Sequence, residues 1–339
     1  MKKNPYIKKW AMFFVIVIVV IAIIWAVIST LDFSNDEKHK FGITFSHKYA
    51  SQSLGLDWTE VYWEIINDLG VRDIRLAVHW DTIEEINGFY NFADFEWMVE
   101  EAEKKDINII MAIGRRTPRW PECHDPNWLG ALSKEDQDKE VFDMLERVVD
   151  HFKDYKNISV WQVENEPLLD LFGECPKADR ELLRKEVELV KSLDSRPVMI
   201  TDTGELSSWT EAASEADIFG VTMYKTVWNK YIGVWRYPWP PAYYYFKTKR
   251  IDNKFDLDKI VVSELQAEPW VTGEETLTEM PLYSQTHMFS RSDFRKNLEY
   301  VQKAGFSESY LWGAEWWYWL KKEKNMPQFW NEAKLIWQE

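Results

Sequence analysis

The chain has 339 residues, 46% of them hydrophobic, which is enough to bury one large core or two medium ones. Its formal net charge of -15 argues against a nucleic-acid partner, because binding a phosphate backbone requires clustered Lys and Arg. Of the 20 Trp, 15 Tyr and 18 Phe, several fall in segments that we interpret as loops. Any single one of these aromatic residues could simply belong to the hydrophobic core. Together they favour a binding site in which aromatic rings stack against a ligand with flat apolar faces, such as a sugar ring.

An uncharged apolar run from Trp10 to Ile28 comes first along the chain, after a lysine-rich start. As a helix, this run is long enough to cross a hydrocarbon core of about 30 Å. We predict a cytoplasmic stub at residues 1–9, a transmembrane signal-anchor helix at 10–28 and a polar linker at 29–40. The positive-inside rule then places residues 41–339 outside the cell membrane, in a single-pass protein. A cleaved signal peptide is the alternative, although no small-x-small cleavage site is evident before Leu31.

Beyond the linker, apolar strand-like runs alternate with amphipathic helical segments. The predicted strands are Phe41–Phe45, Asp73–Val78, Ile107–Ile113, Ile158–Pro167, Pro197–Thr201, Ile218–Tyr224, Ile260–Glu264 and Ser309–Gly313. The predicted helices are Trp58–Leu69, Phe95–Lys104, Val141–Phe152, Arg180–Leu193, Trp209–Ala216, Ala242–Lys249, Phe294–Ala304 and Gln328–Trp337. Eight strand and helix pairs indicate an α/β protein and favour a (β/α)8 TIM barrel over an open sheet. The first strand also lacks the glycine-rich phosphate loop that usually follows it in an open sheet.

Two of these strands end in a glutamate that could carry chemistry. The run ISVWQVENEP delivers Asn165 and Glu166, and IVVSE delivers Glu264. Barrel enzymes keep their chemistry at the carboxyl ends of their strands. Because strands four and seven lie on roughly opposite walls, we expect the two glutamates to face each other across the mouth. Two such carboxyl groups about 5 to 5.5 Å apart are what a retaining glycosidase needs.

The sequence also resembles a known superfamily. The run IRLAVHWDTIEEINGFYNFADFEWMVEEAEKKDINIIMAIG, followed by TPRW, resembles the second and third units of clan A glycoside hydrolases. VENEP resembles their acid/base strand and VVSE their nucleophile strand, and the resemblance covers most of residues 41–320. It implies retaining hydrolysis of β-linked glycosides, with Glu166 as acid/base, Glu264 as nucleophile and no cofactor. The two histidines usual in family 5 are absent after strand three and before Tyr224, and the run from Gly114 to Trp120 resembles families 39 and 42 more.

The resemblance implies supporting roles for four more residues. Arg75 would give Glu264 a charge-assisted hydrogen bond, and Tyr224 would donate its hydroxyl to the same carboxylate. Asn165 would bind the sugar hydroxyl next to the reacting carbon, and Trp312 would form the floor under that sugar. Further substrate-site candidates at strand ends are His79, Trp80, Glu84, Trp120, Asp202, Gln266 and Glu268. Each of these residues also has a purely structural interpretation: it could form an ion pair, be an ordinary acid at a strand end or pack at the rim of the barrel.

Cys123 and Cys175 follow the third and fourth strands, in neighbouring loops on one face. An extracytoplasmic location permits a disulfide between them, which we predict; two unpaired thiols are the alternative. The six histidines are scattered and we predict no metal site.

Taken together, the sequence predicts a membrane-anchored glycoside hydrolase whose partners are a carbohydrate substrate and the lipid bilayer. One alternative is a catalytically silent carbohydrate-binding barrel, although a pure binder has no use for two facing carboxylates. Another is an envelope-glycan transglycosylase, which would share these residues and differ in its acceptor. The sugar, the linkage, endo or exo action and the oligomeric state stay open.

Overall fold

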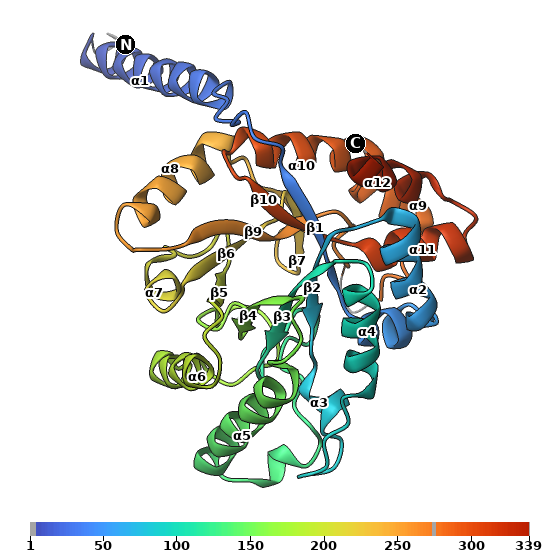
Figure 1. Ribbon diagram of the computed structural model, residues 1–339. Coiled ribbons are helices and arrows are strands. Elements are labelled where there is room, and N and C mark those ends of the chain that lie inside the picture. Colours follow the sequence, from blue (N-terminus) through green and yellow to red (C-terminus); the bar gives the residue numbers. More distant parts are fainter. Residues whose placement is uncertain (1–4, 273–275, 339) are drawn as a thin grey trace.

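The computed structural model describes residues 5–272 and 276–338. Eight parallel strands close into a barrel in the order β1-β10-β9-β6-β5-β4-β3-β2 (Figure 1). The strands are β1 (Lys40–Phe45), β2 (Asp73–Ala77), β3 (Asn108–Ile113), β4 (Ile158–Val163), β5 (Val198–Asp202), β6 (Ile218–Met223), β9 (Lys259–Gln266) and β10 (Glu308–Trp312). The predicted (β/α)8 TIM barrel is therefore confirmed.

Helices surround the barrel on its outer side, and one further helix precedes it (Figure 1). They are α1 (Pro5–Ser29), η1 (Tyr49–Ser53), α2 (Trp58–Glu64), η2 (Ile65–Leu69), α3 (Trp80–Ile83), α4 (Ala93–Glu103), η3 (Leu129–Ala131), α5 (Lys134–Phe152), α6 (Arg180–Leu193), α7 (Thr210–Ala213), α8 (Pro241–Asp252), α9 (Leu282–Met288), α10 (Arg291–Lys303), α11 (Ala314–Glu323) and α12 (Gln328–Gln338). A short hairpin of β7 (Thr226–Asn229) and β8 (Gly233–Arg236) stands apart from the barrel sheet.

Local sequence sets where several helices begin and end. The Ser133 side chain caps α5 by accepting a hydrogen bond from the backbone of Asp136. Ser290 and Asp293 form a capping box at the start of α10, which satisfies two backbone N–H groups that have no partner within the helix. At the other end of a helix, Gly70 adopts a φ of 74° and stops the segment formed by α2 and η2, as the sequence predicts.

The core has an outer and an inner part. Outside the strands, helices bury apolar faces such as Val141, Leu145 and Val148 of α5, spaced by the helical period. Inside the barrel lies a separate buried cluster that six strands supply: Ile110, Val160, Met199, Ile218, Val261 and Tyr310. The barrel interior is thus packed like a core, and polar side chains gather beyond this cluster, toward the carboxyl ends of the strands.

The helix α1 is apolar enough to cross a membrane, with a mean hydropathy of 3.2 over Met12–Ser29 and no burial within the protein. It is compatible with either an anchor or a signal sequence; part of the predicted stub, residues 1–4, lies outside the described residues. The linker packs against the barrel, because Phe33 stacks on Tyr245 at 3.8 Å between ring centroids. The ring of His39 also lies 2.9 Å from the carbonyl oxygen of Phe306. These contacts place the linker beside the amino end of β1, opposite the strand ends that carry the glutamates.

The elements differ from the sequence prediction in several places, of which the following bear on the site. β4 ends at Val163 and not at Pro167, because Glu164 and Glu166 take positive φ values of 60° and 45°, which a strand does not allow. The segment between Tyr224 and Ala242, where we predicted neither helix nor strand, contains the β7–β8 hairpin. The helices α3, α9 and α11 were also not predicted; α11 is buried continuously from Ala314 to Leu320 and therefore lacks an amphipathic period.

Candidate active site

Glu264 lies near the carboxyl end of β9, where two donors hold its carboxylate. Arg75 Nη1 donates to Oε1 at 2.9 Å, and the Tyr224 hydroxyl donates to Oε2 at 2.7 Å. Only 4% of Glu264 is exposed, and Arg75 is fully buried. A charge-assisted hydrogen bond in such surroundings is short and strong, so the carboxylate has one fixed orientation. Both contacts that the sequence predicts for Glu264 are present.

Arg75 also connects Glu264 to the strand that carries the second glutamate. Its Nε donates to Gln162 Oε1 at 2.6 Å, and its Nη2 donates to Asn165 Oδ1 at 2.7 Å. Burying a guanidinium is costly unless its N–H groups find acceptors, and here each of its three nitrogen atoms does. The side chain of a β2 residue thereby sets the relative position of β9 and the end of β4.

Glu166 lies in the turn that follows β4, and 7% of it is exposed. Its backbone N–H donates to Thr201 Oγ1 at 2.8 Å, and its Oε1 accepts a longer hydrogen bond of 3.3 Å from the Thr222 hydroxyl. Burial raises the pKa of the Glu166 carboxyl well above its usual value, and the negative charge of Glu264 raises that pKa further. Both effects favour the protonated form of Glu166.

The turn that presents Glu166 is locked onto the end of β3. The Glu164 carboxylate accepts hydrogen bonds from the backbone N–H groups of Arg115 and Arg116, both at 2.7 Å. Burial raises the pKa of Glu164 to about 7. Gly114 has a φ of 124°, and a Cβ there would collide with the Glu164 carboxylate, so the close approach requires glycine.

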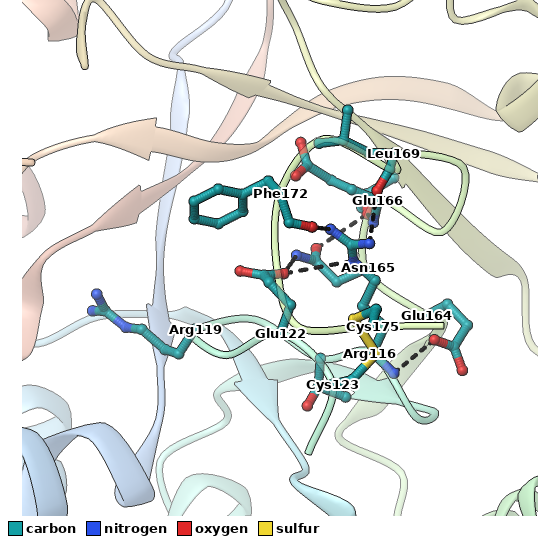
Figure 2. A network of polar contacts seen from close by, with 12 residues as sticks. Arg116, Arg119, Glu122, Cys123, Glu164, Asn165, Glu166, Leu169, Phe172 and Cys175 are labelled. Atoms are coloured by element: carbon teal, nitrogen blue, oxygen red, sulfur yellow. Dashed lines mark hydrogen bonds and ion pairs between the residues drawn. A yellow bond between two sulfur atoms is a disulfide. The ribbon is translucent and has the colours of Figure 1, made fainter. Parts of the chain in front are cut away.

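A further carboxyl group, which the sequence analysis missed, lies beside Asn165. Glu122 Oε2 accepts a hydrogen bond of 3.0 Å from Asn165 Nδ2 and lies 3.8 Å from Arg116 Nε, as Figure 2 shows. Burial raises the pKa of Glu122 to about 7, against the attraction of Arg116. In the sequence, Glu122 lies between Trp120 and Cys123, two residues that we had already selected as candidates. Nothing in the sequence shows that the loop carrying Glu122 folds inward toward the site.

The loops after β3 and β4 are fastened to each other. Cys123 and Cys175 form a disulfide, with their Cα atoms 5.2 Å apart. Arg116 donates to the carbonyl oxygens of Leu169 and Phe172 at 2.9 and 2.8 Å (Figure 2). The loop between β4 and α6 is thus held by a covalent bond and by a buried cation.

Two of the predicted aromatic residues lie at the mouth in different environments. Trp312 is 9% exposed, and the Arg119 guanidinium covers one face of its ring at 4.1 Å. The same guanidinium lies 3.8 Å from the centre of the Tyr49 ring, and Arg119 also pairs with Glu268. Trp312 can therefore offer a sugar only one ring face. Trp120 is 59% exposed and stands at the outer rim.

His79 and Trp80, predicted as substrate-site candidates, are fully buried. The His79 ring nitrogens lie 2.7 Å from Ser46 Oγ and 2.9 Å from Thr117 Oγ1, so both are already occupied. Trp80 donates its indole N–H to Glu84 Oε2 at 2.7 Å. These three side chains hold loops together, and at most 1% of each is exposed; their role in binding a substrate stays a prediction.

Gln266 and Asp202 are likewise bonded within the protein. Gln266 Oε1 accepts the backbone N–H groups of Lys225 and Thr226, both at 2.9 Å, and so fixes the base of the β7–β8 hairpin. Asp202 accepts a hydrogen bond of 2.6 Å from the Ser207 hydroxyl, and burial raises its pKa. Position at a strand end was correct for both residues, but the hydrogen-bond partners come from loops whose course the sequence does not reveal.

Within residues 5–272 and 276–338, no group of His, Cys, Asp or Glu side chains has an arrangement that could hold a metal ion.

Replacing Cys123 and Cys175 together with serine should lower the free energy of unfolding by about 2–4 kcal/mol, because the bond closes a long loop in the unfolded chain. The two cysteines are separated by 52 positions in the sequence. Chemical denaturation of the soluble domain measures the difference, and the parent protein treated with a reductant should match the variant. Equal stability of parent and variant would contradict the prediction.

No family model matches the chain. It is 22% identical over 243 residues to β-galactosidase LacZ of Lactobacillus acidophilus, a match that covers 63% of this chain and 35% of that protein. It is 21% identical over 183 residues to β-galactosidase BgaA of Clostridium cellulovorans, covering 46% of this chain and 28% of that protein. The chain thus spans about a third of the length of the curated relatives it matches.

Several solved structures share the barrel. The GH5_18 protein of Bifidobacterium longum subsp. longum superposes with a TM-score of 0.56 at 12% identity, over 81% of this chain and 70% of that one. Xylanase 10B of Thermotoga petrophila in complex with xylobiose gives a TM-score of 0.54 at 17% identity, over 81% and 82%. At such identities the likeness shows the fold alone. The chain has the (β/α)8 fold of the clan A glycoside hydrolases, as the sequence resemblance implied.

Proposed function

We propose that the chain is a retaining glycoside hydrolase for β-linked sugars, with Glu166 as acid/base and Glu264 as nucleophile. The observation that carries this proposal is the unequal environment of two interacting, buried carboxyl groups. Glu264 accepts short hydrogen bonds from Arg75 and Tyr224, whereas burial and the charge of Glu264 raise the pKa of Glu166. A buried carboxyl group with a raised pKa can serve as a proton donor, and a carboxylate held by two donors can serve as a nucleophile.

The reaction then proceeds in two steps. Glu166 protonates the leaving oxygen while the Glu264 carboxylate attacks the anomeric carbon and forms a glycosyl ester. Glu166, now charged, takes a proton from water, and that water attacks the same carbon and releases Glu264. Arg75 and Tyr224 keep the attacking oxygen in place, and Asn165 and Trp312 are proposed to hold the sugar.

The two rival functions differ in what they explain. A catalytically silent binding barrel would not need two donors, Arg75 and Tyr224, on Glu264. Nor would it need a second carboxyl group, Glu166, with a raised pKa. A transglycosylase uses the same residues, and only the acceptor that replaces water tells it apart. The β-galactosidase names of the curated relatives make β-galactosides the first substrates to try.

We further propose that α1 anchors the protein in the cell membrane, with the amino terminus cytoplasmic and the barrel outside. Its length and apolarity support this, and the linker meets the barrel at the end opposite the glutamates. The mouth then faces away from the point of attachment.

Glu264→Ala should abolish release of the aryl group from an aryl β-glycoside that the parent cleaves, because no nucleophile remains. Azide should restore release and yield a glycosyl azide of inverted anomeric configuration. Release of the aryl group and the anomer are followed by absorbance and NMR. Glu188→Ala, at an exposed position on α6, is the matched control. Normal turnover of Glu264→Ala without azide would contradict the assignment.

Glu166→Ala should slow an aryl glycoside with a poor leaving group by about 10²- to 10⁴-fold, and a dinitrophenyl glycoside much less. Since the raised pKa keeps Glu166 protonated, kcat/KM of the parent should fall as pH rises through that pKa, and the variant should lack this fall. A pH series of kcat/KM on both substrates tests this. If kcat/KM of the variant still fell over the same pH range, the proton donor would be a group other than Glu166.

The anchor is tested on the full chain in membranes. The protein should resist extraction by alkaline carbonate, and its amino-terminal sequence should begin at or near residue 1. An amino terminus near Asp32 would show that α1 is a cleaved signal sequence.

A further inference from the structure

Two aromatic side chains from opposite walls of the barrel meet at the mouth. Phe172 lies in the loop that follows β4 and Glu166, and Trp270 lies in the loop that follows β9 and Glu264. Their ring centroids are 5.7 Å apart, which is a direct contact between aromatic rings. Within the barrel, β5 and β6 separate β4 from β9 along the shorter path. The contact therefore joins the two loops that follow the proposed catalytic residues.

The contact is part of a continuous row. Trp270 also packs edge-on against Tyr224 at 5.1 Å, and the Tyr224 hydroxyl is bonded to Glu264. On the other side, Phe172 packs edge-on against Trp120 at 5.5 Å. We call these four residues, Tyr224, Trp270, Phe172 and Trp120, the aromatic row. It runs from the hydrogen-bond partner of Glu264 to the exposed rim.

The Phe172 end of the row is rigidly supported. Arg116 binds the Phe172 carbonyl oxygen, and Figure 2 shows the Phe172 ring pointing away from the guanidinium. The backbone N–H of Glu174 donates to the Pro121 carbonyl oxygen at 2.9 Å, and Cys175 is bonded to Cys123. A loop fixed in this way acts as a wall of the site and not as a hinged flap.

This arrangement affects which substrates can reach the glutamates. In an open groove a polysaccharide can lie across the mouth with sugars on both sides of the cleaved bond. A bridge between the loops that follow the two glutamates would leave a space that a chain enters by its end. The low exposure of Glu166 and Glu264 agrees with such an enclosed position.

We propose that the aromatic row restricts this site to short glycosides and to the ends of sugar chains, with Phe172 and Trp270 as the specificity-determining residues. The inference rests on the proposed hydrolase function. It adds that internal linkages of a polymer are excluded by the contact between the loops after β4 and β9.

The test begins with the parent protein and a β-linked hexasaccharide of the sugar whose aryl β-glycoside it cleaves, labelled at its reducing end. The first labelled products should be the hexasaccharide shortened from its non-reducing end, followed by stepwise shorter ones. Early appearance of short labelled fragments would show internal cleavage and overturn the inference, while leaving the hydrolase proposal intact. Failure of the parent to cleave any glycoside would instead count against the proposed function.

The double variant Phe172→Ala/Trp270→Ala should open the mouth. Short labelled fragments should then rise several-fold as a share of early products, relative to the parent. Trp63→Ala is the matched control, because Trp63 is a 47% exposed tryptophan on α2, outside the barrel. An unchanged pattern in a folded double variant, checked by circular dichroism, would overturn the inference. If the double variant does not fold, the two single variants are compared in the same way, and the product pattern of the parent decides by itself.

Discussion

The buried ion pair between Arg75 and Glu264 is the interaction on which the rest of the site depends. It joins a residue of β2 to one of β9, and the other nitrogen atoms of the same guanidinium hold Gln162 and Asn165 at the end of β4. Removing one partner of a buried pair leaves the other charge without compensation, typically at about 3–5 kcal/mol. Three strands that are distant in sequence are therefore held in fixed relative positions beside Glu264 and Asn165.

The turn after β4 shows how the fold supports an unfavourable backbone. Glu164 and Glu166 both have positive φ, a conformation that costs non-glycine residues about 1–3 kcal/mol each and persists only where the surroundings enforce it. Here the Glu164 carboxylate binds two backbone N–H groups of the loop after β3, and Asn165 N donates to the Arg116 carbonyl oxygen at 2.7 Å. The strain is thus offset by hydrogen bonds that also fix the direction of the Glu166 side chain.

Much of the fold followed from local patterns, and the errors have identifiable causes. Seven of the eight barrel strands were predicted within two residues of their observed bounds, because each is a short apolar run that is buried on both faces; the fourth was predicted four residues too long. The helix α11 was missed since its burial on all sides removes the amphipathic period. Among the site candidates, His79 and Gln266 lie at the predicted strand ends, yet their polar atoms bind Ser46, Thr117 and backbone groups.

The sequence by itself determined the barrel class, the apolar amino-terminal helix and the strand ends that carry Glu166 and Glu264, since period, length and chain order are local properties. Only the tertiary structure decided that Glu122 joins the site, that Arg119 covers Trp312 and that Phe172 meets Trp270. Those contacts arise between loops that leave different strands. The path of each loop depends on which buried charged and aromatic side chains it contacts across the mouth of the barrel. No local sequence pattern specifies those contacts.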